Sequence, residues 1–123
     1  LGADSLGEAS LTNFQSLGVN TENVTSTGAA ASGVAQITVD ANGQNEIVIV
    51  PGANAELCAA DIDAAKMAFE KSRVLLTQLE VPVPTTMAAL RAGRAAGLIN
   101  VFNSAPAPTE PLPEELYGLC DIV

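Results

Sequence analysis

The second half of the sequence alternates strand-like and helix-like segments, and this alternation limits the fold more than any other feature. Residues 74–79 and 98–102 are short apolar runs typical of buried strands, and residues 84–96 between them have the pattern of a helix. A short helix within 111–119 and a strand that begins at residue 120 extend the series. Strand–helix–strand series of this kind form parallel strands joined by right-handed crossovers. We therefore expect an α/β fold with a partial, Rossmann-like parallel sheet.

A different pattern, typical of a β-hairpin, occupies residues 33–50. Apolar and polar residues alternate on both sides of Asn42-Gly43, a dipeptide that commonly forms tight turns. A two-residue loop would mix apolar and acidic side chains on one face. A three-residue loop, 41–43, with Gly43 as a left-handed bulge, instead groups five apolar residues on one face: Ala35, Ile37, Val39, Ile47 and Ile49. We expect the three-residue loop, in a ribbon that covers something or pairs with a partner, because two strands alone are not stable.

Two further helices are predicted, at residues 4–17 and at residues 59–71. The sequence then divides into three expected parts. Residues 1–18 are a helix of the α/β core, residues 19–54 are the hairpin with its connections, and residues 55–123 are the βαβαβ part of the core.

Charge and residue content argue against several classes of function. The chain has 14 acidic and 5 basic residues, a net charge of −9, which disfavours nucleic acid because phosphate contacts need Lys and Arg. It has no His, so we expect no imidazole catalysis and no metal site. No run reaches the about 20 apolar residues of a membrane span. The two cysteines, Cys58 and Cys120, are expected to be reduced, partly buried thiols of a cytoplasmic protein.

Two polar residues directly follow the predicted parallel strands, at the position where ligands of open parallel sheets bind. Glu80 comes after the strand at 74–79, and Asn103 comes after the strand at 98–102. A carboxylate repels phosphate but is a strong hydrogen-bond acceptor for hydroxyl groups, so Glu80 suits a sugar. The alternative is that Glu80 caps a neighbouring backbone group, and position alone leaves both interpretations open.

Other polar positions have a structural interpretation. Gly52-Ala53-Asn54 matches neither common glycine-rich phosphate motif and is interpreted as a turn. Arg91 and Arg94 lie about one turn apart on a helix of mostly Ala and Leu, which is typical of a solvated face. Three acids are expected at helix ends: Asp4, Asp61 and Asp63.

A series of short motifs resembles a known family. They run from Gly2-Ala3-Asp4-Ser5-Leu6-Gly7, Leu17-Gly18-Val19 and Gly33-Val34-Ala35 through Gly43-Gln44-Asn45, Ile49-Val50-Pro51-Gly52-Ala53-Asn54 and Gln78-Leu79-Glu80-Val81-Pro82 to Asn103-Ser104-Ala105-Pro106-Ala107, Leu112-Pro113-Glu114-Glu115-Leu116 and Asp121-Ile122. Their order and spacing closely resemble the middle of the ribokinase-like sugar kinase family, over essentially the whole chain.

The resemblance implies an α/β kinase with a small β-sheet lid. It implies transfer of the ATP γ-phosphate to the 5-hydroxyl of ribose, with magnesium and activation by a monovalent cation. The hairpin at 33–50 matches part of the lid, which in this family also forms the contact of a homodimer. Ala35 and Ile47 match lid positions that close on the sugar, and Glu80 matches the carboxylate that hydrogen-bonds sugar hydroxyls. Asn103 remains a candidate for a site at the sheet end.

Several family features differ or are absent. Ser104 stands where the family usually has Pro in N-P-A-P-A, which relaxes the loop because Pro fixes φ and Ser does not. The early sugar-binding segment would precede Leu1, the N-x-x-E motif would follow Val123, and the G-x-G-D signature with its Asp base would lie further on. We therefore expect a fragment that is inactive alone and holds no catalytic residue, because phosphoryl transfer depends on those groups.

Two alternatives stay open. The chain could be a non-catalytic α/β module that binds a partner or associates with itself through the hairpin. It could also come from a kinase of the same family that acts on another sugar or a nucleoside. The motifs around Glu80 and Gly52 favour ribose over these substrates.

Overall fold

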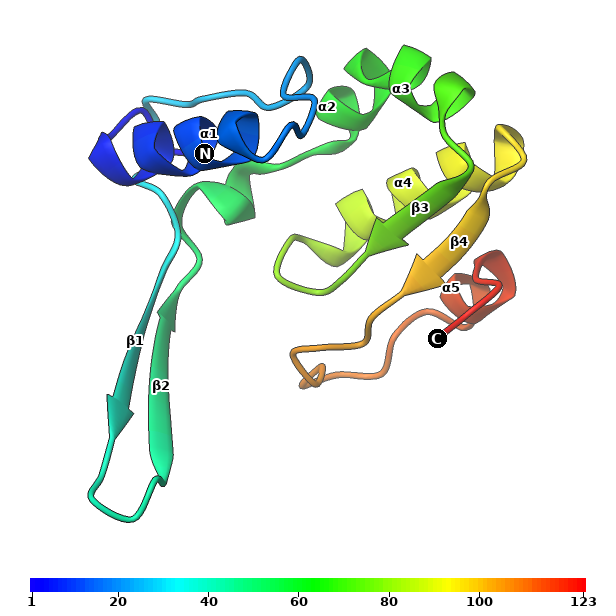
Figure 1. Cartoon of the computed structure of the whole chain (residues 1–123). Coiled ribbons are helices and arrows are strands. Elements are labelled where there is room, and N and C mark those ends of the chain that lie inside the picture. Colours follow the sequence, from blue (N-terminus) through cyan, green and yellow to red (C-terminus); the bar gives the residue numbers. More distant parts are fainter. The chain divides into compact units, whose positions relative to one another are not determined.

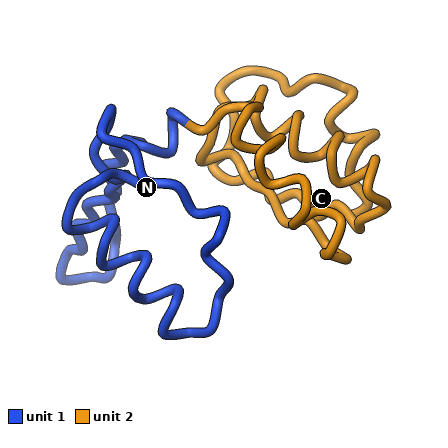
Figure 2. Tube along the Cα trace, turned by 90° about the horizontal axis from the view of Figure 1, so that it is seen from above, with its two compact units in different colours: residues 1–56 blue, residues 57–123 orange.

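The computed structural model describes all residues, 1–123, and they form two compact units, Leu1–Glu56 and Leu57–Val123 (Figure 2). The first unit holds the N-terminal helix and the hairpin, and the second holds the parallel strands with their helices. None of the helices is both long enough and apolar enough to cross a membrane.

The first unit begins with helix α1, Ser5–Ser16, as predicted. Its N-cap is Asp4, whose carboxylate accepts a hydrogen bond from the backbone N–H of Gly7 at 2.9 Å. Gly18 follows the helix with φ of +74°, a conformation that glycine adopts without strain and that commonly ends helices.

The hairpin consists of strands β1, Val34–Val39, and β2, Asn45–Val50, which lie side by side as an antiparallel ribbon (Figure 1). Ala35 pairs with Ile49 and Ile37 pairs with Ile47, so the predicted three-residue loop is confirmed. Gly43 has φ of +82°, and its N–H donates to the carbonyl of Asp40 at 3.1 Å. Every residue of both strands is exposed. After β2 the chain turns into a short 3-10 helix, η1, Gly52–Glu56, where the sequence predicted a turn.

The second unit is built on two parallel strands, β3, Val74–Thr77, and β4, Ile99–Phe102. Helix α4, Val83–Ala95, connects them and packs against both, and helix α5, Glu114–Leu119, packs against α4 (Figure 1). The predicted last strand is present only as a parallel bridge between Val101 and Ile122. These elements confirm the α/β fold.

The prediction of a single helix at 59–71 is wrong, because the helix is interrupted at Ala65. The structure has two short helices, α2, Ala59–Ala64, and α3, Lys66–Lys71. At Ala65 the backbone has ψ of 9°, and its N–H donates to the carbonyl of Ile62 at 3.1 Å, a tighter 3-10 bond. Neither Gly nor Pro stands at this break, so the sequence contains no local signal for it.

The core of the second unit lies between the sheet and helices α4 and α5. Its buried apolar residues are Met87, Leu90, Phe102 and Leu116. The side chains of alternate strand residues point away from this core, and three of them are exposed: Val74, Leu76 and Ile99.

Both cysteines are free, but Cys58 is exposed, so the expectation of two partly buried thiols is wrong for that residue.

Candidate functional site

The loops that follow β3 and β4 meet at the carboxyl edge of the parallel strands. The backbone N–H of Asn103 donates to the carbonyl of Thr77 at 2.9 Å, and that of Leu79 donates to the carbonyl of Ala105 at 3.0 Å. These bonds continue the strand pairing beyond Thr77, where β3 ends two residues earlier than predicted. Glu80 and Asn103 therefore both lie in joined loops at the strand ends.

The carboxylate of Glu80 makes no hydrogen bond and no ion pair in the structure. The residue is half-buried, and only its backbone N–H is engaged, by the side-chain oxygen of Gln78. The capping role considered as an alternative for this side chain is therefore not the one it has here. A free, half-buried carboxylate can accept hydrogen bonds from the hydroxyl groups of a ligand.

Asn103 has a local structural role. Its side-chain oxygen accepts a hydrogen bond from the backbone N–H of Ala105 at 3.0 Å, which closes the loop through Ser104. The residue is exposed, and its amide nitrogen makes no hydrogen bond in the structure. It can therefore offer a ligand a donor, while its acceptor is already used.

Two buried threonines at the start of α4 anchor other backbone segments, and one of them, Thr86, holds the loop of Glu80 in place. The hydroxyl of Thr86 donates to the carbonyl of Gln78 at 3.2 Å, two residues before Glu80. The hydroxyl of Thr85 donates to the carbonyl of Leu57 at 2.6 Å. They are 4% and 1% exposed, for Thr85 and Thr86, respectively. The sequence analysis missed this pair, although polar residues at the start of an otherwise apolar helix face are a usable signal.

Ala35 and Ile47 lie in the first unit, on the hairpin face predicted from the alternation. Their strand partners are Ile49 and Ile37, so the four side chains share one apolar face. Ile47 is 48% exposed, and Ala35 is also exposed. These side chains offer no hydrogen bonds and can contact only apolar parts of a ligand.

Arg91 and Arg94 lie on an exposed face of α4, as predicted, and each also pairs with a carboxylate. The guanidinium of Arg91 binds both carboxylate oxygens of Glu115 at 2.8 and 2.7 Å, and this hydrogen bonding lowers the pKa of Glu115. Arg94 binds Asp121 at 3.2 Å. The pKa of Asp121 is also lowered, mainly by the backbone N–H of Asn100. Both arginines thus join α4 to the C-terminal segment.

The side chains of this chain do not fit a magnesium–ATP site. No group of three or more His, Cys, Asp or Glu side chains could hold a metal ion. Both arginines of α4 are paired with carboxylates, and the glycine-containing segment at 52–54 is part of η1.

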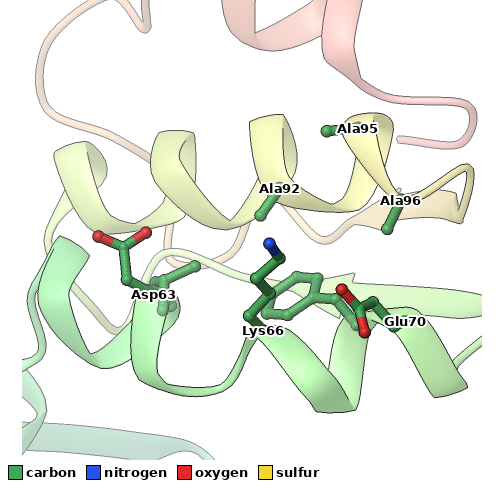
Figure 3. Close-up of a pocket in the computed structure, with 8 residues that line it drawn as sticks. Asp63, Lys66, Glu70, Ala92, Ala95 and Ala96 are labelled. Carbon is green, nitrogen blue, oxygen red and sulfur yellow. The ribbon is translucent and has the colours of Figure 1, made fainter.

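A groove of the second unit lies elsewhere, between α2–α3 and α4, with a volume of about 620 Å³ (Figure 3). Its floor is apolar, and the Lys66 ammonium points across it toward α4, with Asp63 and Glu70 to either side. Its lining residues are Ile62, Asp63, Lys66, Phe69, Glu70, Ala92, Ala95 and Ala96. None of these was predicted as a site residue, and none lies at the strand ends.

Comparisons with known proteins agree with the motif series. The family model described as "pfkB family carbohydrate kinase" matches residues 1–123. The chain is 37% identical over 123 residues to a ribokinase from Staphylococcus aureus (strain COL), covering 100% of this chain and 40% of that protein. It is 37% identical over 110 residues to a deoxyribokinase from Salmonella typhi, covering 89% of this chain and 36% of that protein.

A solved ribokinase structure is also similar to this chain. The structure of Arabidopsis thaliana ribokinase complexed with ribose and ATP superposes with a TM-score of 0.80 at 25% identity, covering 99% of this chain and 40% of that one. The chain therefore spans about 40% of the length of the ribokinases that it matches.

Proposed function

The chain belongs to the pfkB family of carbohydrate kinases, and we propose that it forms the lid and part of the sugar site of an ATP-dependent ribokinase. The reaction is transfer of the γ-phosphoryl group of ATP to the 5-hydroxyl of D-ribose. Within the kinase, the proposed role of this chain is to bind and orient the sugar. The chain covers about 40% of the length of a ribokinase, and we expect it to be inactive alone.

The free carboxylate of Glu80 carries the proposal. It is half-buried at the carboxyl edge of the parallel strands, where ligands of such sheets bind, and nothing within the chain neutralises it. A carboxylate in this position accepts hydrogen bonds from neighbouring hydroxyls of a sugar. Asn103, from the adjoining loop, can add a donor through its amide nitrogen. Thr86 holds the loop of Glu80 to α4 and so supports its orientation.

The hairpin is proposed to serve as the lid. Ala35 and Ile47 would contact the apolar side of the ribose ring, which excludes water without competing for its hydroxyls. The ribbon also exposes apolar side chains on its other face, among them Val48, which is 59% exposed. Covering that face by the hairpin of a second subunit would remove this apolar surface from water, which supports a homodimer joined through the lids.

The cofactors are assigned to the remaining segments of the family fold. ATP supplies the phosphoryl group, magnesium neutralises its developing charge, and a monovalent cation activates the enzyme. Within this chain, no three or more His, Cys, Asp or Glu side chains cluster in a way that could hold a metal ion. A sugar kinase that uses ATP is expected in the cytoplasm. The net charge of −9 disfavours binding to nucleic acid, because phosphate contacts need Lys and Arg.

A second substrate has specific support. The deoxyribokinase of Salmonella typhi is as similar to this chain, at 37% identity, as the ribokinase is. The carboxylate of Glu80 could accept hydrogen bonds from either sugar. Ribose remains the proposal because the match to ribokinases extends over the whole chain.

Turnover by the complete gene product that carries residues 1–123 tests the proposal. ADP release would be measured with ribose, 2-deoxyribose, adenosine and no sugar, at equal ATP and magnesium. We expect ribose to give the highest kcat/KM. A preference for 2-deoxyribose or adenosine would replace the substrate, and ADP release that no sugar or nucleoside stimulates would contradict the proposal.

A further inference from the structure

The root of the hairpin, residues 31–33 and 51–53, is a close crossing of two backbone segments. The N–H of Ala53 donates to the carbonyl of Ala31 at 2.7 Å. A Cβ atom on Gly33 would lie 2.5 Å from the carbonyl oxygen of Pro51, and one on Gly52 would lie 2.4 Å from that of Ala31. Only glycine fits at either position, so the two segments are held in one arrangement.

The carboxylate of Asp4 fixes this root to the start of α1. One oxygen accepts the backbone N–H of Ser32 at 2.7 Å, and the other accepts the Ser32 hydroxyl at 2.8 Å. Ser32 is only 8% exposed, and its hydroxyl oxygen accepts the backbone N–H of Gly2 at 3.1 Å. We call the paired side chains of Asp4 and Ser32 the clasp.

The Asp4 carboxylate of the clasp is ionised at neutral pH. Hydrogen bonds from the backbone of Ser32 and of Gly7 lower the pKa of Asp4 to about 2. The carboxylate therefore stays ionised near neutral pH and keeps its full capacity as an acceptor.

Beyond the root, no packing fixes the direction of the hairpin. Every residue of β1 and β2 is exposed, so the strands are not buried against the rest of the first unit. A small rotation at residues 31–33 would move the side chains farther along the ribbon, because displacement grows with distance from a hinge. The orientation of the Ala35 and Ile47 face thus depends on how firmly the root is held.

We propose that Asp4 is a positioning residue, which acts through Ser32 to set the direction in which the hairpin leaves its unit and so the fit of its apolar face to the sugar. This inference rests on the proposed function of the hairpin as a lid. It assigns to Asp4 a role in substrate binding that is separate from its role in capping α1.

The substitution Asp4→Asn separates the two roles. Asn caps helices about as well as Asp, so α1 keeps its start. An Asn side chain has one acceptor oxygen in place of two, so it cannot accept both hydrogen bonds from Ser32 in the same way. The matched control is Asp61→Asn, because Asp61 also accepts a backbone N–H at a helix start, that of Cys58 at 2.9 Å, but lies in the second unit.

The experiment compares both variants in the complete gene product. For Asp4→Asn we expect the KM for ribose to rise about tenfold, because a small misplacement of contact groups can cost up to about 100-fold. The KM for ATP should stay within about twofold, and Asp61→Asn should leave both constants within the same range. Ser32→Ala should reproduce the Asp4→Asn result, and Ser32→Thr, which keeps the hydroxyl, should restore the ribose KM.

Amide hydrogen exchange provides a readout that does not depend on turnover. In Asp4→Asn, exchange should accelerate at residues 31–33 and at Ala53 and stay unchanged within α1. Wild-type ribose turnover with an unchanged ribose KM in the variant, or unchanged exchange at the root, would overturn the inference. Failure of the proposed function is distinguishable, because the wild-type protein itself would then show no turnover of ribose.

Discussion

Gly93 on α4 faces Asn100 on β4 so closely that a Cβ atom on Gly93 would lie 2.3 Å from the side-chain oxygen of Asn100. Asn100 is fully buried, and its amide nitrogen donates to the carbonyls of Leu90 at 2.8 Å and Leu119 at 2.9 Å. It thereby ties α4 to the end of α5. A glycine inside a helix destabilises by about 1 kcal/mol relative to alanine. The second unit tolerates this because the missing side chain makes room for the Asn100 amide.

Gly93→Ala should therefore destabilise the protein, although alanine favours helix. The added methyl group would displace the Asn100 oxygen and also meet Leu75, whose methyl carbon is 2.9 Å away. We expect the free energy of unfolding to fall by about 1–3 kcal/mol, as for other overpacked cores. Gly118→Ala in α5 is the matched control, because a Cβ there meets nothing within 4 Å. It should be neutral or stabilise by up to about 1 kcal/mol in urea denaturation.

The two residues should also be energetically coupled. Asn100→Ala removes the donor for the Leu90 and Leu119 carbonyls and should cost about 1–3 kcal/mol. In that background Gly93→Ala no longer meets the amide oxygen. The double variant should be more stable than the sum of the two single effects by at least about 0.5 kcal/mol. Strict additivity in the double-mutant cycle would show that the close contact does not govern Gly93.

The lowered pKa of Asp4 should make the free energy of unfolding depend on pH in the acid range. Its pKa is about 2 in the folded chain and 3.8 for an unperturbed aspartate, so the folded state favours the ionised form. Its stabilising contribution is then complete above about pH 4 and is lost as the pH falls toward 2. Asp4→Asn should flatten the decline of unfolding free energy over this interval. Urea denaturation between pH 2 and 6 checks this, and a variant profile parallel to the wild-type one would contradict it.

We expect the hairpin face that carries Val48 to form the contact of a homodimer. Val48 lies opposite Gln36, on the face that does not carry Ala35 and Ile47. Val48→Lys places a charge on that face and should shift a dimer toward monomer in light scattering after size-exclusion chromatography. Asn13→Lys, at an exposed position of α1, adds the same charge away from the hairpin and should leave the mass unchanged. A Val48→Lys protein that remains fully dimeric at low concentration would exclude this face as the contact.

Features set by short-range chemistry were predictable from the sequence. The hairpin register follows from the alternation around Asn42-Gly43, and the end of α1 follows from Gly18. The placement of Glu80 and Asn103 at the strand ends follows from the strand–helix–strand order. These features depend on residues that lie close together in the chain or on the general topology of parallel sheets.

The features that were missed depend on partners far apart in the sequence. Asp4 and Ser32 are 28 positions apart, as are Thr85 and Leu57. Each of these side chains also has an ordinary local interpretation, as a cap or as a residue in a helical turn. The break at Ala65 has no sequence signal at all. Pairing of this kind follows from the folded arrangement and not from local propensity.

Ribose binding by the Glu80→Gln variant tests the central claim most directly. The isosteric change removes the charge of the free carboxylate at the strand ends, and the complete gene product would be titrated with ribose by calorimetry. Glu114→Gln, at an exposed and unpaired carboxylate of α5, is the control. We predict that Glu80→Gln weakens ribose binding by about 1–3 kcal/mol, as expected for loss of a charged hydrogen bond, while the control binds like wild type. Unchanged ribose affinity in a folded Glu80→Gln protein would contradict the account.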